Sequence, residues 1–349
     1  MICICAPYGR TETTAAALRL ADLCLTQQRE VRFLALGTCE RRVHPYWDGR
    51  VVRSEALYRP AQFGRAEHVI WFDVAGQLLA RTARLWPDAQ QILVASWHRL
   101  QPEQRSSLSS YHRVVCPAPA VQRALRPLVG PRTTVDAVLW DAGLTPLRRS
   151  LAALAATELR VTFLCDAHAV DECGAALLHL VDEVLGLPQR LAAVHLLALK
   201  AWSRRDRQRL SRLRRRHGAR LVVGADVSWP AQMRVFNETH VCVLPGIRAD
   251  FGLWALRALA CGVPVLTYGI SPYTAFLRHG YNSWLLRGET VSNWCAAVTA
   301  VPALAAFLGT LTTLLARPET LGELVMPEGP LATLASNFAL FWEHCLAPR

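Results

Sequence analysis

Residues 240–284 read HVCVLPGIRADFGLWALRALACGVPVLTYGISPYTAFLRHGYNSW, and this stretch decides the fold. The apolar run 240–244 stops at Pro245 and Gly246, a pattern typical of a buried strand that ends in a turn. Residues 263–268 form a second apolar run and predict a second buried strand, and a third is expected over 282–286.

A helix is predicted between the first two strands, over residues 251–261, and its almost wholly apolar sequence indicates that it is buried. Asp250 is expected to cap its start, and Gly262, with Pro264 shortly after it, is expected to end it. Strand, loop, helix and strand in this order form a parallel α/β unit. Ligands in such sheets lie beyond the carboxyl ends of the strands.

These residues resemble the nucleotide-sugar site of GT-B glycosyltransferases, in the retaining, glycogen-synthase-like branch. The match covers about forty-five residues and is carried by Phe251, Gly252, Leu253, Ala255, Leu256, Ala258, Ala260, Gly262, Pro264, Val265, Gly280 and Asn282. The resemblance implies an α/β fold of two Rossmann-like domains that face each other across a cleft, with the nucleotide sugar on the second domain. It also implies that Phe251, Gly252 and Leu253 contact the donor.

Two positions depart from the family pattern. The family carries two glutamates, of which the first approaches the sugar and the second holds the ribose, and this chain has Ala249 and Arg257 there. Asp250 lies one step from the first position and is expected to take over a catalytic role. Arg257 cannot accept hydrogen bonds from a ribose, so a different, cationic contact with the donor is expected from it.

Length and composition set the frame for the rest of the chain. The 349 residues suffice for two domains, and no apolar run free of charges is long enough for a stable membrane insertion. The N-terminus predicts a core strand rather than a signal peptide, and the scattered cysteines predict free thiols in a reducing cytoplasm and no metal site. The net charge of +12 favours a polyanionic partner such as nucleic acid or an anionic membrane surface.

Alternating strands and helices predict two Rossmann-like domains, residues 1–145 and residues 146–335. The GT-B resemblance implies that the first domain binds the acceptor and the second binds the nucleotide sugar. Residues 336–349 are expected to form a helix that crosses back to the first domain, an expectation taken from the GT-B resemblance. A helix is also predicted across residues 290–315.

Four residues of the first domain follow predicted strands and are expected to face the cleft. Gly9 and Arg10 lie in a loop that opens a helix, where backbone amides suit a phosphate. The alternative for them is an ordinary tight turn. Asp73 and His98 are expected to contact the acceptor or the transferred sugar; the alternatives are a helix cap for Asp73 and a structural role for His98. The loop lacks both the Walker and the GxGxxG pattern, which excludes the usual P-loop and dinucleotide enzymes.

Three further donor contacts are expected in the second domain. Lys200 follows a predicted strand and is expected to meet the pyrophosphate, together with Arg248. Trp229 is expected to stack on the nucleotide base, the alternative being packing at the start of a helix.

Two basic segments are expected to contact an anionic acceptor. Residues 37–59 interleave arginines with aromatic side chains, a pattern that suits phosphates and stacked bases, and the alternative is a solvated loop with its aromatics folded back on the core. Residues 202–217 form a helix with eight arginines, and a solvated face is the alternative there. The residues singled out are Arg41, Arg42, Tyr46, Trp47, Arg50, Arg204 and Arg205.

The resemblance implies a glycosyltransferase that moves a hexose or pentose from a nucleotide sugar, UDP-glucose or a relative, without a permanent cofactor or metal ion. The sequence pattern and the positive charge, taken together, are similar to those of bacteriophage enzymes that modify 5-hydroxymethylcytosine in DNA. Such an enzyme would act in the host cytoplasm on a flipped base. Two alternatives stay open. One is a small-molecule, lipid or cell-surface acceptor; the other is a non-enzymatic binding protein on a GT-B fold.

Overall fold

The computed structural model describes residues 1–9, 11–39, 43–44, 46–53, 64–72, 77–95, 100, 102–141, 143, 158–165, 167–187, 191–198, 201–224, 229–246, 249–287, 290–292, 298–300, 304–317, 321 and 328–347. The chain divides into two compact units. Unit 1 comprises Met1–Gly143, Ser292–Ala297 and Thr333–Arg349, and unit 2 comprises Leu144–Val291 and Val298–Ala332.

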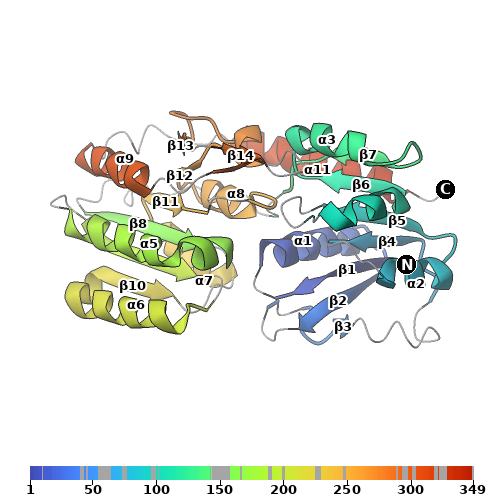
Figure 1. Cartoon of the computed structure of the whole chain (residues 1–349), viewed down its shortest axis with the longest axis horizontal. Helices are drawn as coiled ribbons and strands as arrows, with labels where there is room; N and C mark the ends of the chain where they lie inside the picture. The colour runs from blue at the N-terminus through green and yellow to red at the C-terminus, as the bar shows by residue number, and fades with distance from the viewer. Residues whose placement is uncertain are drawn as a thin grey trace. The chain divides into compact units, whose positions relative to one another are not determined.

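Unit 1 is built on a seven-stranded parallel sheet with the order β3-β2-β1-β4-β5-β6-β7 (Figure 1). Its strands are β1 (Ile2–Tyr8), β2 (Val31–Cys39), β3 (Val52–Arg53), β4 (His68–Trp71), β5 (Gln90–Val94), β6 (Arg113–Cys116) and β7 (Thr134–Ala137). Its helices are α1 (Glu12–Thr26), α2 (Gln77–Leu85) and α3 (Pro119–Leu125), with the 3-10 turns η4 (Pro102–Ser110) and η5 (Arg126–Leu128).

The central strands of this sheet are buried on both faces. Every residue of β4 is buried, and Cys3, Cys5, Trp71 and Leu93 belong to one continuous apolar core. Near-continuous apolar strands are expected in a parallel sheet that helices cover on both sides. The cysteines that the structure describes are free thiols and most are buried, so they act here as small apolar core residues.

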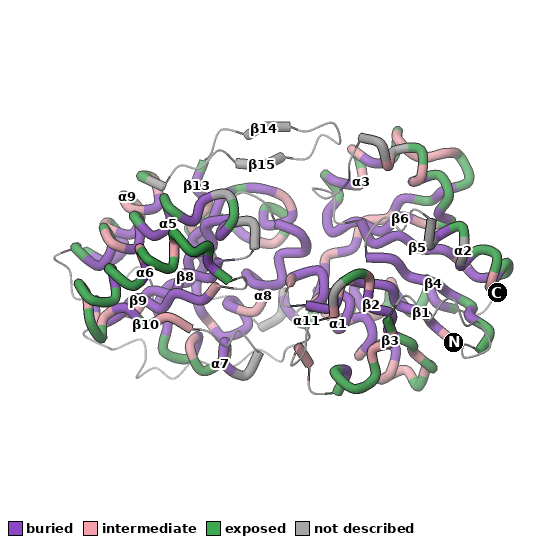
Figure 2. Tube along the Cα trace, turned by 60° about the horizontal axis from the view of Figure 1, so that its bottom comes forward, coloured by how far each residue is buried: buried purple, intermediate pink, exposed green. Residues whose placement is uncertain are grey.

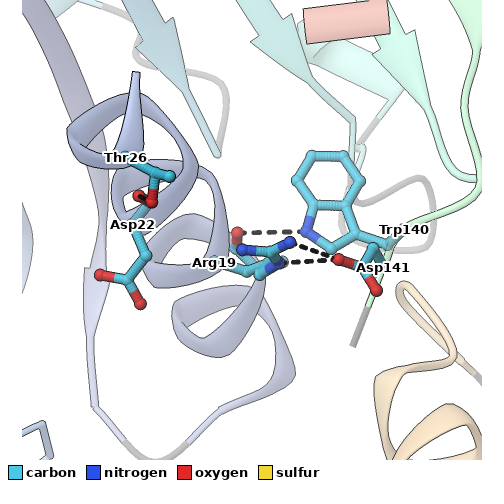
Figure 3. A network of polar contacts seen from close by, with 6 residues as sticks. Arg19, Asp22, Thr26, Trp140 and Asp141 are labelled. Carbon is cyan, nitrogen blue, oxygen red and sulfur yellow. Dashed lines mark hydrogen bonds and ion pairs between the residues drawn. The ribbon is translucent and has the colours of Figure 1, made fainter. Parts of the chain in front are cut away.

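The last helix, α11 (Glu328–Cys345), contributes to the core of unit 1 from Thr333 onward. The ring of Trp140 packs edge-on against Phe338 and Trp342, at centroid distances of 5.1 and 5.9 Å. Figure 3 shows how Trp140 and its neighbour Asp141 also hold α1: the indole Nε1 donates to the Ala16 carbonyl, and Arg19 donates to the carboxylate. The chain after β7 is thereby fixed to unit 1 by aromatic packing and by charge.

Unit 2 is built on a six-stranded parallel sheet with the order β10-β9-β8-β11-β12-β13. Its strands are β8 (Leu159–Cys165), β9 (Leu191–Ala198), β10 (Leu221–Gly224), β11 (Val241–Leu244), β12 (Val265–Tyr268) and β13 (Ser283–Leu286), and a small two-stranded sheet pairs β14 (Thr290–Ser292) with β15 (Val298–Ala300). Its helices are α5 (Ala167–Gly186), α6 (Arg204–His217), α7 (Trp229–Glu238), α8 (Leu253–Ala260) and α9 (Leu304–Ala316), with the turns η6 (Gly218–Arg220) and η7 (Tyr273–Ala275).

Helices cover the sheet of unit 2. Helix α5 contacts both α6 and α9, whereas α7 and α8 pack on β8 and β12. The strand order reverses between β8 and β11, and crossovers between parallel strands are right-handed. Helices α5 and α6 therefore lie on one face of the sheet, and α7 and α8 lie on the other. The strands β8 and β11 and the helix α8 are buried, and α6 is largely exposed (Figure 2).

The predicted fold class, two parallel-sheet α/β domains, is confirmed. The prediction of one helix across residues 290–315 is wrong at its start, because β14 and β15 occupy part of it and α9 begins only at Leu304. The β-branched residues of TVS and VTA in these strands favour extended backbone. Among the described residues, no helix combines the length and the apolar character needed to span a bilayer.

Candidate functional site

The start of α8 is set by the backbone of Gly252. This residue is the N-cap and lies in the left-handed region, at φ 74° and ψ 15°, and no side chain caps the helix. The expectation that Asp250 caps α8 is therefore wrong: the chain reverses two residues later, at the one residue type that adopts this conformation without strain. Asp250 is buried just before the reversal.

Gly252 also packs tightly against the loop that follows β12. A methyl group added there would lie 2.7 Å from Cζ of Phe276 and 3.4 Å from Cγ of Pro272. The segments after β11 and after β12, which are neighbouring strands, thus meet at the start of α8. The partial positive charge of a helix N-terminus makes this junction a favourable place for an anion.

The far end of α8 is closed by a Schellman motif. The N–H of Gly262 donates to the Leu259 carbonyl and the N–H of Val263 to the Ala258 carbonyl, both at 2.9 Å. Gly262 has the positive φ that this motif requires. The predicted stop at Gly262 is confirmed, and it sends the chain directly into β12.

Asn282 supports the junction from behind. Its Oδ1 accepts from the Arg278 N–H at 2.8 Å, and its Nδ2 donates to the Phe276 carbonyl at 3.2 Å. The side chain is buried, so both contacts are shielded from water. Asn282 holds in place the loop that carries Phe276, the residue that contacts Gly252.

Arg257 lies one turn into α8 and is partly buried. Its guanidinium carbon is 4.8 Å from the centroid of the Trp254 ring, within the range of a cation–π contact. Trp254 is buried, so the contact restricts where the arginine points. Phe251 and Leu253 are buried on either side of Gly252.

In unit 1 the loop after β1 is held by two threonines. Thr11 is the N-cap of α1 and accepts from the Thr14 N–H at 3.1 Å. The Thr14 hydroxyl accepts from the Gly9 N–H at 3.1 Å and donates to the Pro7 carbonyl at 2.9 Å. Thr14 thus gives the Gly9 amide a partner within the loop.

A tyrosine at the end of β1 is fixed by an acid far away in the sequence. The Tyr8 hydroxyl donates to Asp48 Oδ1 at 2.8 Å, and the same oxygen accepts from the N–H groups of Val43 and His44. Burial, and then the bond to Asp48, raise the pKa of Tyr8 well above its usual range, so the phenol stays protonated. The Asp48-Gly49 pair is a turn signal, but no sequence pattern links it to Tyr8.

The aromatic and basic segment around residue 47 divides between core and surface. Trp47 is only 2% exposed, packs on Phe33 and donates from Nε1 to Asp22 at 3.1 Å. Tyr46 is 44% exposed, and the Arg50 guanidinium lies 3.7 Å from its ring centroid. In this segment the exposed pair Tyr46 and Arg50, rather than Trp47, is open to a ligand.

Solved structures of similar shape identify the fold of the chain. Sucrose-phosphate synthase from Thermosynechococcus elongatus superimposes with a TM-score of 0.67 at 14% identity, over 99% of this chain and 97% of that chain. HepE from Anabaena, solved with UDP and glucose, superimposes with a TM-score of 0.65 at 13% identity, over 99% and 97%. The chain has the GT-B glycosyltransferase fold.

The chain is also similar in sequence to curated glycosyltransferases. A D-inositol 3-phosphate glycosyltransferase from Rhodococcus erythropolis is 25% identical over 325 residues, which cover 84% of this chain and 68% of that protein. One from Mycobacterium marinum is 34% identical over 65 residues, and the chain spans only 14% of its length. No protein-family model matches the chain.

The GT-B fold gives each sheet one point at which the strand order reverses, and ligands bind there, beyond the strand ends. In unit 1 this point lies between β1 and β4, and Gly9 directly follows β1. In unit 2 it lies between β8 and β11, and Asp250 and Gly252 follow β11. Trp229 begins α7, after β10 at the sheet edge.

Several expected site residues lie outside the part of the chain that the structure describes. In the sequence, Asp73 and His98 follow the neighbouring strands β4 and β5, and Lys200 follows β9. The full set is Arg10, Arg41, Arg42, Asp73, His98, Lys200 and Arg248. Arg204 and Arg205, in contrast, are described and exposed, in the first turn of α6.

Proposed function

We propose that this chain is a glycosyltransferase that takes UDP-glucose or a related nucleotide sugar and transfers the sugar to a hydroxyl group. The observation that carries the proposal is the junction of Gly252 with Phe276, at the carboxyl ends of β11 and β12. It combines a helix N-terminus with tight backbone packing beside the point where the strand order of unit 2 reverses. The solved HepE structures contain UDP, glucose or UDP-glucose, which supports this class of donor.

The donor diphosphate becomes the leaving group, so charge develops on it and preorganised donors and cations stabilise that charge. In the proposal the backbone at Phe251, Gly252 and Leu253 contributes from α8, while Arg248, Lys200 and Arg10 supply positive charge. Gly9 lies in the phosphate-facing loop of unit 1. Arg257 contacts the nucleotide in place of the family's glutamate, and Trp229 stacks on the base.

The transfer proposed is retaining and uses no metal ion. The bond from the sugar's anomeric carbon to the diphosphate oxygen breaks, and a bond to the acceptor oxygen forms on the same face. The acceptor proton passes to the departing diphosphate, so UDP and a glycoside are the products. Asp250, Asp73 and His98 are proposed to orient the sugar and the acceptor hydroxyl.

For the acceptor, the net charge of +12 and the arginines of α6 favour a hydroxymethylated base in DNA. A second candidate, a small phosphorylated polyol or sugar, is favoured by the names of the relatives, a D-inositol 3-phosphate glycosyltransferase and a sucrose-phosphate synthase. Both candidates present a hydroxyl group next to negative charge.

One experiment separates these acceptors. The full chain is incubated with a panel of nucleotide sugars and either duplex DNA containing 5-hydroxymethylcytosine or a set of polyol and sugar phosphates. Product masses are then read. A hexose- or pentose-sized increment on the nucleoside supports the DNA acceptor, and the same increment only on a small phosphate replaces it with the second candidate. No increment together with no donor binding would favour a non-enzymatic binding protein.

A further inference from the structure

Helix α6 carries an unusual density of positive charge on the surface of unit 2. Its apolar side chains, Leu210 and Leu213, are buried, and Ser203 caps its start by accepting from the Asp206 N–H at 3.1 Å. The rest of the helix is largely exposed (Figure 2). Its arginines are Arg204, Arg205, Arg207, Arg209, Arg212, Arg214, Arg215 and Arg216.

The arginines form rows, because residues three and four apart share one face of a helix. By helical spacing, Arg205, Arg209, Arg212 and Arg216 form an inner row, and Arg209, Arg212 and Arg216 of this row line the groove beside α5. The outer row lies on the opposite flank of the helix and consists of Arg207 and Arg214, which are seven residues apart. The central row between them is Arg204, Gln208, Ser211 and Arg215.

Among the described residues, most of these arginines have no acidic partner. Arg209 pairs with Asp206 at 3.5 Å and Arg216 with Asp182 at 2.7 Å. Within the described residues no ion pair engages Arg204, Arg205, Arg207, Arg212, Arg214 or Arg215. Like charges three and four residues apart repel each other along the helix, and a bound polyanion would relieve that repulsion.

A groove runs between the inner row and α5. It encloses about 870 Å³. On the α5 side the lining includes the small side chains of Ala175 and Ala176, His179, and Asp182, whose carboxylate is paired with Arg216 and His217. On the α6 side it is lined by Arg209, Arg212, Arg215 and Arg216. Small side chains facing a cationic wall leave room for an extended anionic chain.

We propose that α6 binds duplex nucleic acid by lying in its major groove, with one sugar-phosphate strand in the groove between α5 and α6. The major groove of B-DNA, about 12 Å wide, admits an α-helix. The inner row then meets the phosphates of one strand and the outer row those of the other, which fixes the register of the helix. Gln208 and Ser211, in the central row, face the base edges.

The two-sided distribution of charge favours a duplex over a lipid surface. A planar membrane meets a surface helix along one face, whereas these arginines occupy both flanks as well as the centre. The exposed face of α6 also carries no large apolar side chain to enter a bilayer, because Leu210 and Leu213 are buried. The surface is distinct from the sugar-transfer site proposed above, although a DNA acceptor would use both.

The test is a binding titration of the full chain with a labelled duplex of about 20 base pairs, at several salt concentrations and without any nucleotide sugar. Two double variants remove equal charge from the two flanks: Arg205→Ala with Arg212→Ala on the inner row, and Arg207→Ala with Arg214→Ala on the outer row. The matched control is Arg123→Ala with Arg126→Ala, two exposed arginines of unit 1. Each variant is also titrated with the corresponding single strand.

For the wild type, the logarithm of the association constant is expected to fall against the logarithm of salt with a slope of about −4. Each α6 variant should lower the magnitude of that slope by about 2 and weaken duplex binding roughly tenfold at moderate salt. The outer-row variant should leave single-strand binding unchanged, because a single strand occupies only the groove. The control should match the wild type.

Three results would overturn the proposal. They are an absence of duplex binding, equal effects of the control and α6 variants, and binding to anionic phospholipid vesicles in place of the duplex. Release of UDP from UDP-glucose, measured without DNA, reports on the proposed enzyme separately, and the α6 variants should keep the wild-type rate.

Discussion

Gly252 lies against the ring of Phe276 so closely that a single methyl group on the glycine would come within 2.7 Å of Cζ. The glycine also has a positive φ, so two independent constraints act on this residue. Gly280 offers the matched comparison: its φ is 75°, but an added methyl group would meet open space.

We expect Gly280→Ala to cost about 1–2 kcal/mol of unfolding free energy, the penalty of a left-handed backbone alone. Gly252→Ala should cost at least about 1 kcal/mol more, because Phe276 must also shift. Urea unfolding of both variants measures the difference. Equal losses in the two variants would show that the contact with Phe276 carries no constraint.

Arg257→Ala is expected to raise the Michaelis constant for the nucleotide sugar roughly tenfold, because a hydrogen bond to a charged group contributes about 1.5–3 kcal/mol. Arg257→Lys keeps the charge but loses the planar group over Trp254, so an intermediate value is expected. Initial rates of UDP release give both constants. An unchanged donor constant in Arg257→Ala, with the fold intact, would remove Arg257 from the donor site.

The ion pair of Arg19 with Asp141 should stabilise unit 1. Arg19 Nε donates to Asp141 Oδ2 at 2.9 Å (Figure 3), and the carboxylate is buried. The guanidinium carbon of Arg19 lies 5.6 Å from the centroid of the Phe338 ring. We expect Arg19→Ala and Asp141→Ala each to lower the unfolding free energy by about 1–3 kcal/mol. The double variant should lose less than the sum of the two, since the partners are coupled. Additive losses would contradict a direct interaction.

Because of His195, the free energy of unfolding is expected to fall in mild acid. Burial, first of all, lowers the pKa of this histidine below its usual 6.5, while Glu238 acts in the opposite direction and Arg160 in the same one. The unfolded chain therefore binds the proton more readily, and the free energy of unfolding falls as pH drops below about 6.5. The contribution is at most about 1.4 kcal/mol per pH unit.

His195→Gln should lose this part of the pH dependence. Unfolding of the wild type and of the variant is measured between pH 7.5 and 5.5, and the difference between the two curves isolates the histidine. Parallel curves would mean that His195 has the same pKa in the folded and the unfolded chain.

The elements around α8 follow from local sequence. The apolar run of β11, the Pro and Gly after it and the Gly262 stop are short-range signals, and the structure has each of them. The predicted start of α8 is wrong because Asp250 is a residue type that commonly caps helices. The chain instead turns at Gly252, where packing against Phe276, far along the sequence, decides the outcome.

The other residues that sequence reasoning missed depend on contacts between distant segments. Tyr8 and Asp48 lie 40 residues apart, and only the pairing of β1 with β2 brings their loops together. Trp47 lies in a sequence pattern that suits base stacking, but its ring is buried in the core beside Phe33. A side chain's type shows what it can bind, and only tertiary packing shows whether it is exposed.

The most direct test of the central claim is the release of UDP from a panel of UDP-sugars by the full chain, with Gly252→Ala as the disabled site and Gly280→Ala as its control. We predict release from at least one UDP-sugar by the wild type and by Gly280→Ala, and a loss of at least tenfold in Gly252→Ala. If the wild type neither releases UDP nor binds any nucleotide sugar, the proposed donor site at the start of α8 is wrong.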